Sequence, residues 1–293
     1  MSGTPLIGLG TYAFFWQHSE LAPERLDLTA MLERSHALGV GLFQICDYAP
    51  LEQLDVAALA DLAAQARDLD ITLELGTRGI GTQHLDRYLA MATAVGATTV
   101  RSMVNTATEK PTLSEAEAAL SEALPAWKGA GVALALETYE QISSTDLVSI
   151  VESVGSPSLG ICLDPANSVA ALENPRDVID RTASYVKNIH VKDFQFTRRG
   201  GWVGFTLEGA PLGTGLLDFD YLIDTVRPAE RGINLIVEHW LPLHDTLEET
   251  VRPAERGITQ IIEHWLPLGD SIEETIETEN TWNTSTLQYL RSK

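Results

Sequence analysis

Short apolar runs alternate with helical patterns along the whole chain, and this alternation constrains the fold more than any other feature. The runs are rich in Val, Ile and Leu and show little polar alternation, which is typical of strands buried on both faces of a parallel sheet. They cover residues 6–12, 41–48, 71–77, 98–105, 132–138, 159–164, 186–193 and 234–240. Eight strands separated by helices over about 250 residues predict an α/β fold, a (β/α)8 TIM barrel.

The segments between the runs have the spacing of helices that bury one face. In residues 56–69 and 113–127, apolar side chains recur every three or four positions. An open doubly wound sheet is the alternative architecture, and it usually carries a glycine-rich phosphate loop after its first strand. Here the first strand reads Gly8-Leu9-Gly10-Thr11-Tyr12-Ala13, which lacks the third glycine and opens no helical pattern. The barrel is therefore favoured, as one domain over residues 1–293.

A tandem repeat lies near the C-terminal end. Residues 226–250 and 251–275 agree at 19 of 25 positions and follow each other without a linker. Two copies are too few for a solenoid, so we interpret the repeat as a duplication of one strand and the start of one helix. It leaves nine candidate strands for a barrel of eight. The first copy is more apolar (INLIV against ITQII) and leaves an ordinary connection from the seventh strand, so we expect it to supply the eighth.

The charge balance limits the partners that the chain can bind. It has 20 Lys and Arg against 41 Asp and Glu, a formal net charge of −21. Nucleic acid and anionic membrane surfaces both require basic protein surface, so neither is expected as a partner. Cys46 and Cys162 lie inside apolar runs and predict buried, reduced thiols in a cytoplasmic protein. No signal peptide or membrane span is expected.

Four successive strands end on a residue that can bind a metal ion. Glu137 ends the fifth strand, Asp164 the sixth, His190 lies in the seventh and Glu238 ends the eighth. The carboxyl ends of barrel strands form one face, where active sites lie, so these four side chains should meet. Carboxylates that share a desolvated site repel one another unless they are protonated or bound to a metal ion. Three carboxylates and one imidazole suit one divalent ion, with Mn2+ expected first and Mg2+ or Co2+ as alternatives.

The sequences around these four residues resemble the xylose-isomerase-like TIM barrel superfamily, which contains sugar phosphate isomerases and epimerases. The resemblance rests on LALET at Glu137, GICLDPANS at Asp164, NIHVKDF at His190 and LIVEHW at Glu238, and it extends over nearly the whole chain. It implies that these four residues bind one divalent metal ion, and that Glu137 and Glu238 move a proton on and off carbon. A metal ion that holds the substrate oxygens stabilises the enediolate on which such a proton transfer depends.

The chain departs from the pattern of ketose 3-epimerases at three positions. Those enzymes carry a histidine at the position of Asn167, an arginine at that of Phe196 and a glutamate at that of Ser143. The expected reaction is still isomerisation or epimerisation of a small keto-sugar or sugar acid. A sugar-acid branch, in which relatives decarboxylate or dehydrate oxidised sugars, is the alternative; 3-oxo-isoapionate is an example of a 3-oxo acid that could lose CO2 through the same enediolate.

Cationic, amide and aromatic side chains near the same face are candidates for binding the substrate. Arg78, Arg101 and Lys192 could bind a carboxylate or phosphate, although either arginine could instead pair with one of the many acids. Asn167 and Trp16 complete the candidate set, because sugar rings stack on aromatic faces. Trp202, in a glycine-rich loop after the seventh strand, could belong to a lid.

Further interpretations involve other partners or residues. A small-molecule carbohydrate is the expected ligand, and a homo-oligomer is compatible with the chain. Related barrels serve as subunits of C-glycoside-cleaving complexes, which is a second alternative. An endonuclease IV-like repair enzyme is disfavoured, because it would need more histidines than the seven present and a basic groove. Glu263, in the second repeat, is the alternative to Glu238 as the ligand from the eighth strand.

Overall fold

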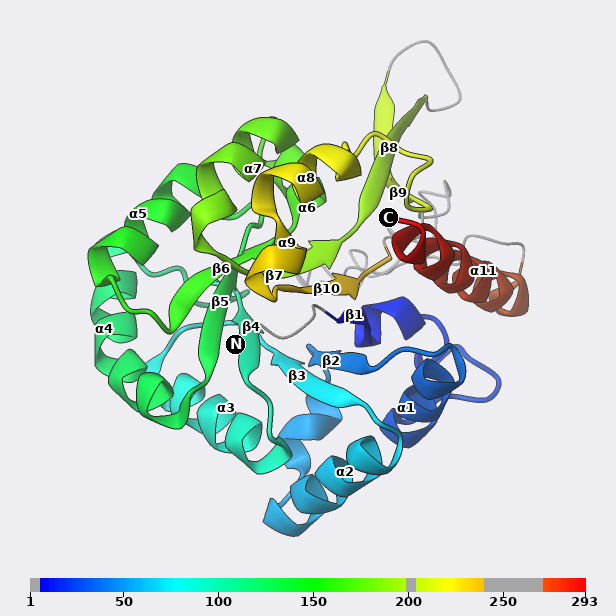
Figure 1. Cartoon of the computed structure of the whole chain (residues 1–293), viewed down its shortest axis with the longest axis horizontal. Coiled ribbons are helices and arrows are strands. Elements are labelled where there is room, and N and C mark those ends of the chain that lie inside the picture. Colours follow the sequence, from blue (N-terminus) through cyan, green and yellow to red (C-terminus); the bar gives the residue numbers. More distant parts are fainter. Residues whose placement is uncertain (1–5, 199–203, 240–270) are drawn as a thin grey trace, which may run out of the picture.

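The eight apolar runs form a closed barrel of parallel strands, as the sequence predicts (Figure 1). The structure, a computed structural model, describes residues 6–198, 204–239 and 271–293. Around the barrel the strands follow the order β1-β10-β7-β6-β5-β4-β3-β2. They are β1 (Ile7–Gly10), β2 (Leu42–Cys46), β3 (Thr72–Gly76), β4 (Thr99–Ser102), β5 (Ala133–Glu137), β6 (Leu159–Leu163), β7 (Val186–Val191) and β10 (Asn234–Val237).

Helices surround the strands and follow them in sequence (Figure 1). The α-helices are α1 (Leu28–Ala37), α2 (Val56–Asp68), α3 (Thr82–Val95), α4 (Leu113–Ala130), α5 (Ser144–Val154), α6 (Pro165–Ala170), α7 (Pro175–Thr182), α8 (Phe219–Val226), α9 (Pro228–Arg231) and α11 (Ile272–Arg291). Three short 3-10 turns are η1 (Thr11–Phe14), η2 (Ala49–Gln53) and η3 (Ala183–Tyr185).

Local signals in the sequence set the helix ends. The Thr112 side chain and Glu115 form a capping box that satisfies two free N–H groups at the start of α4. That helix ends at Gly131, whose φ of 72° is the left-handed conformation that glycine adopts without strain. Leu120 and Trp127, on the inner face of α4, are fully buried against the barrel. The apolar face read from the sequence is thus the face that packs, except at the first residue of the helix, Leu113, which is 40% exposed.

The first copy of the repeat closes the barrel. β10 lies between β1 and β7, with Leu235 beside Ile7 and Ile189. Asn234 at its start accepts a hydrogen bond from the Leu6 N–H at 3.0 Å and donates one to Glu74 at 2.7 Å.

The second copy differs at the two positions that make these contacts. It carries Thr259 in place of Asn234 and Gln260 in place of Leu235. A glutamine at the buried position of Leu235 would have to lose its hydration without a matching partner. The first copy therefore fits the eighth strand better. Most of the second copy, including Glu263, lies outside the described residues.

A two-stranded hairpin follows β7, where the sequence predicts one strand extending to residue 193. β8 (Asp193–Arg198) pairs antiparallel with β9 (Phe205–Ala210) and projects from the barrel (Figure 1). The Asp193 carboxylate accepts backbone N–H groups of Phe194, Gly213, Gly215 and Leu217 at 2.8–3.0 Å. These bonds turn the chain between β7 and the hairpin and anchor the segment that leads to α8. Trp202, the candidate lid residue, lies outside the described residues.

The C-terminal helix α11 packs beside η1, which follows β1 (Figure 1). Its buried Glu279 accepts hydrogen bonds from the backbone N–H groups of Trp16 (2.8 Å) and Gln17 (3.1 Å). Asn283, one turn further on, donates to the Ala13 carbonyl at 2.7 Å and contacts the His239 ring nitrogen Nε2 at 2.8 Å. The helix therefore ties η1 to the end of β10.

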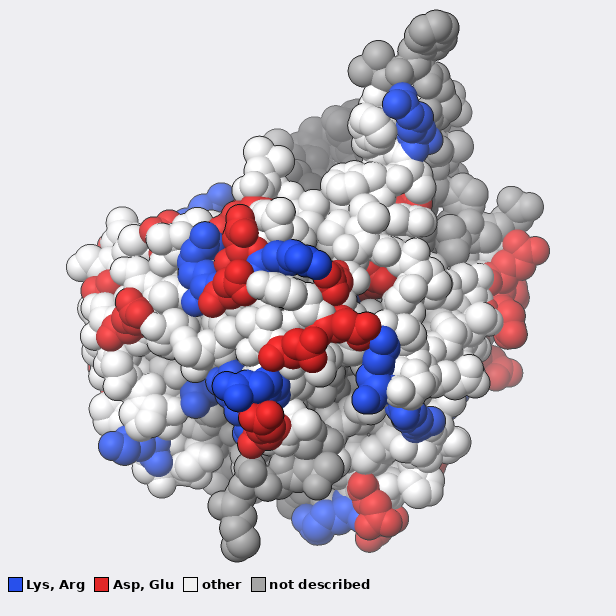
Figure 2. Space-filling view, turned by 45° about the horizontal axis from the view of Figure 1, so that its top comes forward, with Lys and Arg blue, Asp and Glu red and all other residues white. Residues whose placement is uncertain are grey.

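Charged groups of opposite sign lie near each other on the surface. On the face shown in Figure 2, Lys and Arg side chains are interspersed with Asp and Glu rather than gathered into a continuous basic patch. None of the helices in the described ranges is long and apolar enough to span a bilayer.

Candidate metal centre

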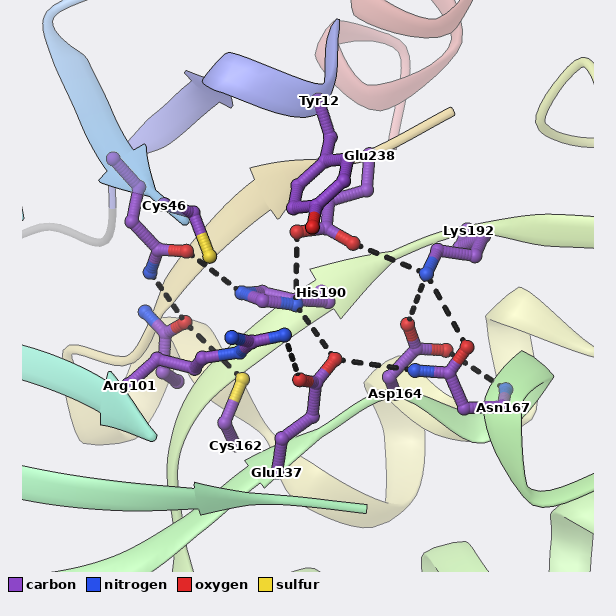
Figure 3. Close-up of polar contacts among 12 residues, drawn as sticks. Tyr12, Cys46, Arg101, Glu137, Cys162, Asp164, Asn167, His190, Lys192 and Glu238 are labelled. Carbon is purple, nitrogen blue, oxygen red and sulfur yellow. Dashed lines mark hydrogen bonds and ion pairs between the residues drawn. The ribbon is translucent and has the colours of Figure 1, made fainter. Parts of the chain in front are cut away.

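The four residues predicted as metal ligands lie together at the carboxyl ends of β5, β6, β7 and β10. One ligand atom from each of Glu137, Asp164, His190 and Glu238 lies within 4.8 Å of all the others (Figure 3). All four side chains are buried, the most exposed being Glu238 at 4%. They meet because each lies at or next to the last residue of a buried parallel strand, and parallel register places those strand ends at one rim of the barrel.

His190 and Asp164 are each oriented by contacts that leave one atom facing the cluster. The ring nitrogen Nδ1 of His190 lies 3.2 Å from both Glu137 Oε1 and Glu238 Oε1. Asp164 caps α6: its Oδ1 accepts the backbone N–H groups of Ala166 (3.0 Å) and Asn167 (3.2 Å). Its other oxygen, Oδ2, points away from the helix end. The cap thus fixes the rotamer that presents Oδ2 to the cluster.

Two cations border the cluster. The Lys192 Nζ lies 2.8 Å from Asp164 Oδ2 and 3.1 Å from Glu238 Oε2 (Figure 3). The Arg101 guanidinium, 3% exposed, pairs with Glu137 and also contacts Asp47 Oδ2 at 3.2 Å. Each of the three clustered carboxylates therefore faces a positive charge, which offsets part of the cost of burying it.

The cations and carboxylates shift one another's pKa. Burial alone would raise the pKa of Glu137, but Arg101 and His190 outweigh it and lower that pKa to about 2. Burial and the neighbouring carboxylates raise the pKa of Asp164 despite the contact with Lys192. Burial opposes the charged form of His190, yet the adjacent glutamates raise its pKa. The lowered pKa keeps Glu137 ionised, whereas the raised pKa values mean that Asp164 and His190 each hold a proton more strongly than the same side chains do in water.

Three carboxylate oxygens in the cluster accept no hydrogen bond of good geometry. They are Glu137 Oε2, Asp164 Oδ2 and Glu238 Oε1, one from each ligand candidate. Each instead lies within ion-pair distance of a nitrogen: Glu137 Oε2 of Arg101, Asp164 Oδ2 of Lys192 and Glu238 Oε1 of His190. A buried oxygen without a hydrogen bond is costly. One such oxygen on each of three carboxylates, beside an imidazole nitrogen, is the donor set that a divalent ion binds, so the residues fit the metal that the resemblance implies.

The structure places the candidate substrate residues at different distances from the cluster. Asn167 and Lys192 adjoin it: the Asn167 amide donates to Glu137 Oε1 at 3.1 Å and accepts from Lys192 at 3.3 Å. Arg101 touches Glu137 from within the barrel wall. Arg78, whose side chain is 46% exposed, pairs with Asp47 at 3.1 Å. Trp16 is only 2% exposed and lies under α11.

Several residues around the site were missed by sequence reasoning. Asp47 directly follows β2 and gathers Arg78, Arg101 and the Tyr12 hydroxyl, the last at 2.9 Å. Its place after a strand is the signal that identified the ligands, and could have identified it too. Gln44 and Glu74 lie deeper in the barrel, where polar side chains interrupt apolar strands. Tyr12 gave no signal, because nothing in the sequence shows which strands face it.

Comparisons with known proteins agree with this fold. The family model of the xylose isomerase-like TIM barrel matches residues 32–268. The chain is 56% identical to a 3-oxo-isoapionate decarboxylase of Pectobacterium atrosepticum over 242 residues, 83% of this chain and 88% of that protein.

Two solved structures share the fold at low sequence identity. A D-psicose 3-epimerase of Clostridium cellulolyticum H10, crystallised with D-tagatose, superposes with a TM-score of 0.70 at 13% identity, covering 98% of both chains. A Mycobacterium smegmatis barrel in complex with magnesium superposes with a TM-score of 0.64 at 14% identity, covering 97% of this chain and 96% of that one. The family match and the relative at 56% identity show that the chain belongs to the xylose isomerase-like TIM barrel family, in the branch that contains the Pectobacterium decarboxylase.

Proposed function

We propose that the protein is a divalent-metal-dependent decarboxylase of a small 3-oxo sugar acid. The observation that carries the metal chemistry is the set of three buried carboxylates that converge with His190, one ligand atom of each lying within 4.8 Å of all the others. The choice of decarboxylation rests on the relative at 56% identity, which is named for that reaction. Isomerisation or epimerisation, the first expectation from sequence, is the second candidate, because Glu137 and Glu238 both border the cluster.

The residues of the chain have distinct parts in this proposal. Glu137, Asp164, His190 and Glu238 would hold the ion, with Mn2+ first and Mg2+ or Co2+ as alternatives. When bound, it would stabilise the negative charge that the substrate gains as CO2 leaves. Arg101 and Asn167 hold Glu137 in place from two sides. Arg78 and Lys192 provide positive charge for an acidic substrate.

Decarboxylation requires one proton on the carbon that loses CO2, whereas epimerisation requires one to leave and one to arrive. Both oxygens of Glu137 have partners, namely Arg101, Asn167 and His190. Glu238 has fewer partners within the cluster, His190 at Oε1 (3.2 Å) and Lys192 at Oε2 (3.1 Å). We therefore assign delivery of the single proton to Glu238.

The test is to incubate the protein with 3-oxo-isoapionate in D2O with Mn2+ and to follow CO2 release and deuterium incorporation by NMR. We expect one CO2 and one carbon-bound deuterium per product, and loss of activity on treatment with EDTA that Mn2+ restores. Deuterium exchange into unconsumed substrate without CO2 release would favour the isomerase instead. Activity that is indifferent to EDTA would contradict the metal centre.

Lys192 allows a separate test of the metal centre through binding alone. Its ammonium beside Asp164 and Glu238 opposes a second cation, so we expect Lys192→Met to tighten Mn2+ binding about tenfold, or about 1.4 kcal/mol. Lys187→Met is the matched control on the same strand, since Lys187 lies away from the cluster and is half-buried. Titration calorimetry measures both. Weaker binding in Lys192→Met would show that the lysine supports the site instead of opposing the ion.

A further inference from the structure

A network of buried amides lies below the metal centre, inside the barrel. Gln44 on β2, Glu74 on β3 and Asn188 on β7 are each at most 2% exposed. The Glu74 carboxylate accepts amide N–H groups from Gln44 (3.2 Å), Asn188 (2.9 Å) and Asn234 (2.7 Å). Three donors from three different strands thus converge on one carboxylate, which can only accept when ionised.

These contacts fix which way the Gln44 amide points. Its nitrogen Nε2 lies 3.2 Å from Glu74 Oε2 and 3.2 Å from Asn188 Oδ1, both acceptors. The reversed amide would place its oxygen against two other oxygens, with no donor between them. The Asn188 amide cannot turn to relieve this, because its own nitrogen donates to Glu74. Gln44 therefore directs its carbonyl oxygen, Oε1, away from Glu74.

That oxygen faces His190. Gln44 Oε1 lies 2.8 Å from the ring nitrogen Nε2 of His190, within a fully buried contact. An amide oxygen carries no hydrogen, so Nε2 must carry the proton that joins them. In the neutral ring the lone pair is then on Nδ1, and Nδ1 is the nitrogen that lies 3.2 Å from Glu137 and Glu238.

We propose that Gln44, oriented by Glu74, is a positioning residue that keeps the proton of His190 on Nε2 and presents the Nδ1 lone pair to the carboxylate cluster. Hydrogen bonds from outside the ligand shell commonly fix the tautomer and the ring plane of a metal-binding histidine, and their loss weakens metal binding about 10- to 100-fold. The inference rests on the proposed function, since a bound ion is what uses the lone pair. Glu74 acts on His190 indirectly, because its carboxylate accepts the Gln44 amide N–H and so orients that amide.

The test uses protein labelled with 15N in its histidine rings, and Zn2+ as a diamagnetic probe. The His190 signals are those that move when Zn2+ is added and that are missing from His190→Asn. In the wild-type protein we expect a slowly exchanging proton on Nε2. In Gln44→Met we expect that proton to exchange at least about tenfold faster and the Zn2+ dissociation constant, measured against a chelator, to rise about 10- to 100-fold.

The controls separate positioning from simple loss of structure. Gln65→Met makes the same substitution on the exposed side of α2, where the amide oxygen accepts a hydrogen bond from the Thr29 hydroxyl at 3.1 Å, and should change neither reading. Glu74→Gln removes the carboxylate that orients the amide and should shift both readings in the same direction as Gln44→Met. If Gln44→Met does not fold, Glu74→Gln decides the question by the same two measurements.

Two outcomes distinguish this inference from the proposed function. Wild-type protein that binds no Zn2+ at the cluster would overturn the proposed metal centre, and the inference with it. Tight Zn2+ binding in both the wild type and Gln44→Met, with an equally protected Nε2 proton, would overturn the role of Gln44 and leave the metal centre standing.

Discussion

Replacing Glu238 by glutamine should lower kcat for decarboxylation about 10^2- to 10^4-fold, the range found when a group that transfers a proton is lost. The substitution keeps the shape of the side chain but removes a charged ligand candidate from the buried cluster and the proposed proton donor. Mn2+ binding should weaken at least about tenfold as well, because the site loses one of three carboxylates. Steady-state kinetics and calorimetry measure the two losses.

The repeat supplies a matched control for this substitution. Glu263 stands in the same EHW sequence in the second copy, but the barrel is closed by the strand that precedes Glu238. Glu263→Gln should therefore leave kcat and Mn2+ binding within about twofold of the wild type. Equal losses in the two variants would contradict a site built from the first copy alone.

Replacing Arg101 by methionine should destabilise the metal-free protein by about 3–5 kcal/mol, the cost of leaving a buried charge without its partner. Arg101 lies between Glu137 and Asp47, and Glu137 is as buried as the arginine. Chemical denaturation in the presence of EDTA measures the loss. The effect should be larger than that of Arg78→Met, because Arg78 is half-exposed and water can replace its contact with Asp47.

The pH dependence and a double variant test the same ion pair. Arg101 helps to lower the pKa of Glu137 from 4.5 to about 2, so the pair stabilises the fold above about pH 4.5 and this contribution disappears as pH falls towards 2. Arg101→Met should lose that dependence. Adding Glu137→Gln to Arg101→Met should recover part of the stability, because the neutral amide no longer needs a cation. Strictly additive losses would show that the two residues do not interact.

The sequence predicted the barrel and the clustered ligands because both depend on local patterns. Apolar runs identify the strands, and the residue at a strand end must lie at the carboxyl rim, as Glu137 and Asp164 do. What could not be predicted depends on which strands face each other across the barrel. Gln44 contacts His190, 146 residues away, and Glu279 reaches back 263 residues to bury Trp16. No spacing pattern in the sequence predicts such contacts.

The hairpin after β7 and the different roles of Arg78 and Arg101 likewise depend on contacts between distant residues, which the sequence alone does not predict. The sequence of β8 continues the β-type pattern of β7, so the predicted strand ran on to residue 193; the turn is made by Asp193 bonding to glycine N–H groups some 20 residues ahead. Arg78 and Arg101 both pair with Asp47, yet burial makes one a permanent partner of Glu137 and leaves the other half in solvent. Charge alone does not reveal that difference.

The duplicated segment shows which positions of the eighth strand are constrained by contacts within the barrel. The two copies differ at six positions, and three of these differences fall within the four residues that form β10 in the first copy. The copy in the barrel has Asn234 and Leu235, which bond to Glu74 and pack beside Ile7, whereas the other has Thr259 and Gln260. Because Asn234 and Leu235 make contacts that threonine and glutamine would not reproduce, these differences favour the first copy as the eighth strand. They thereby favour Glu238 over Glu263 as the ligand that the eighth strand is expected to supply.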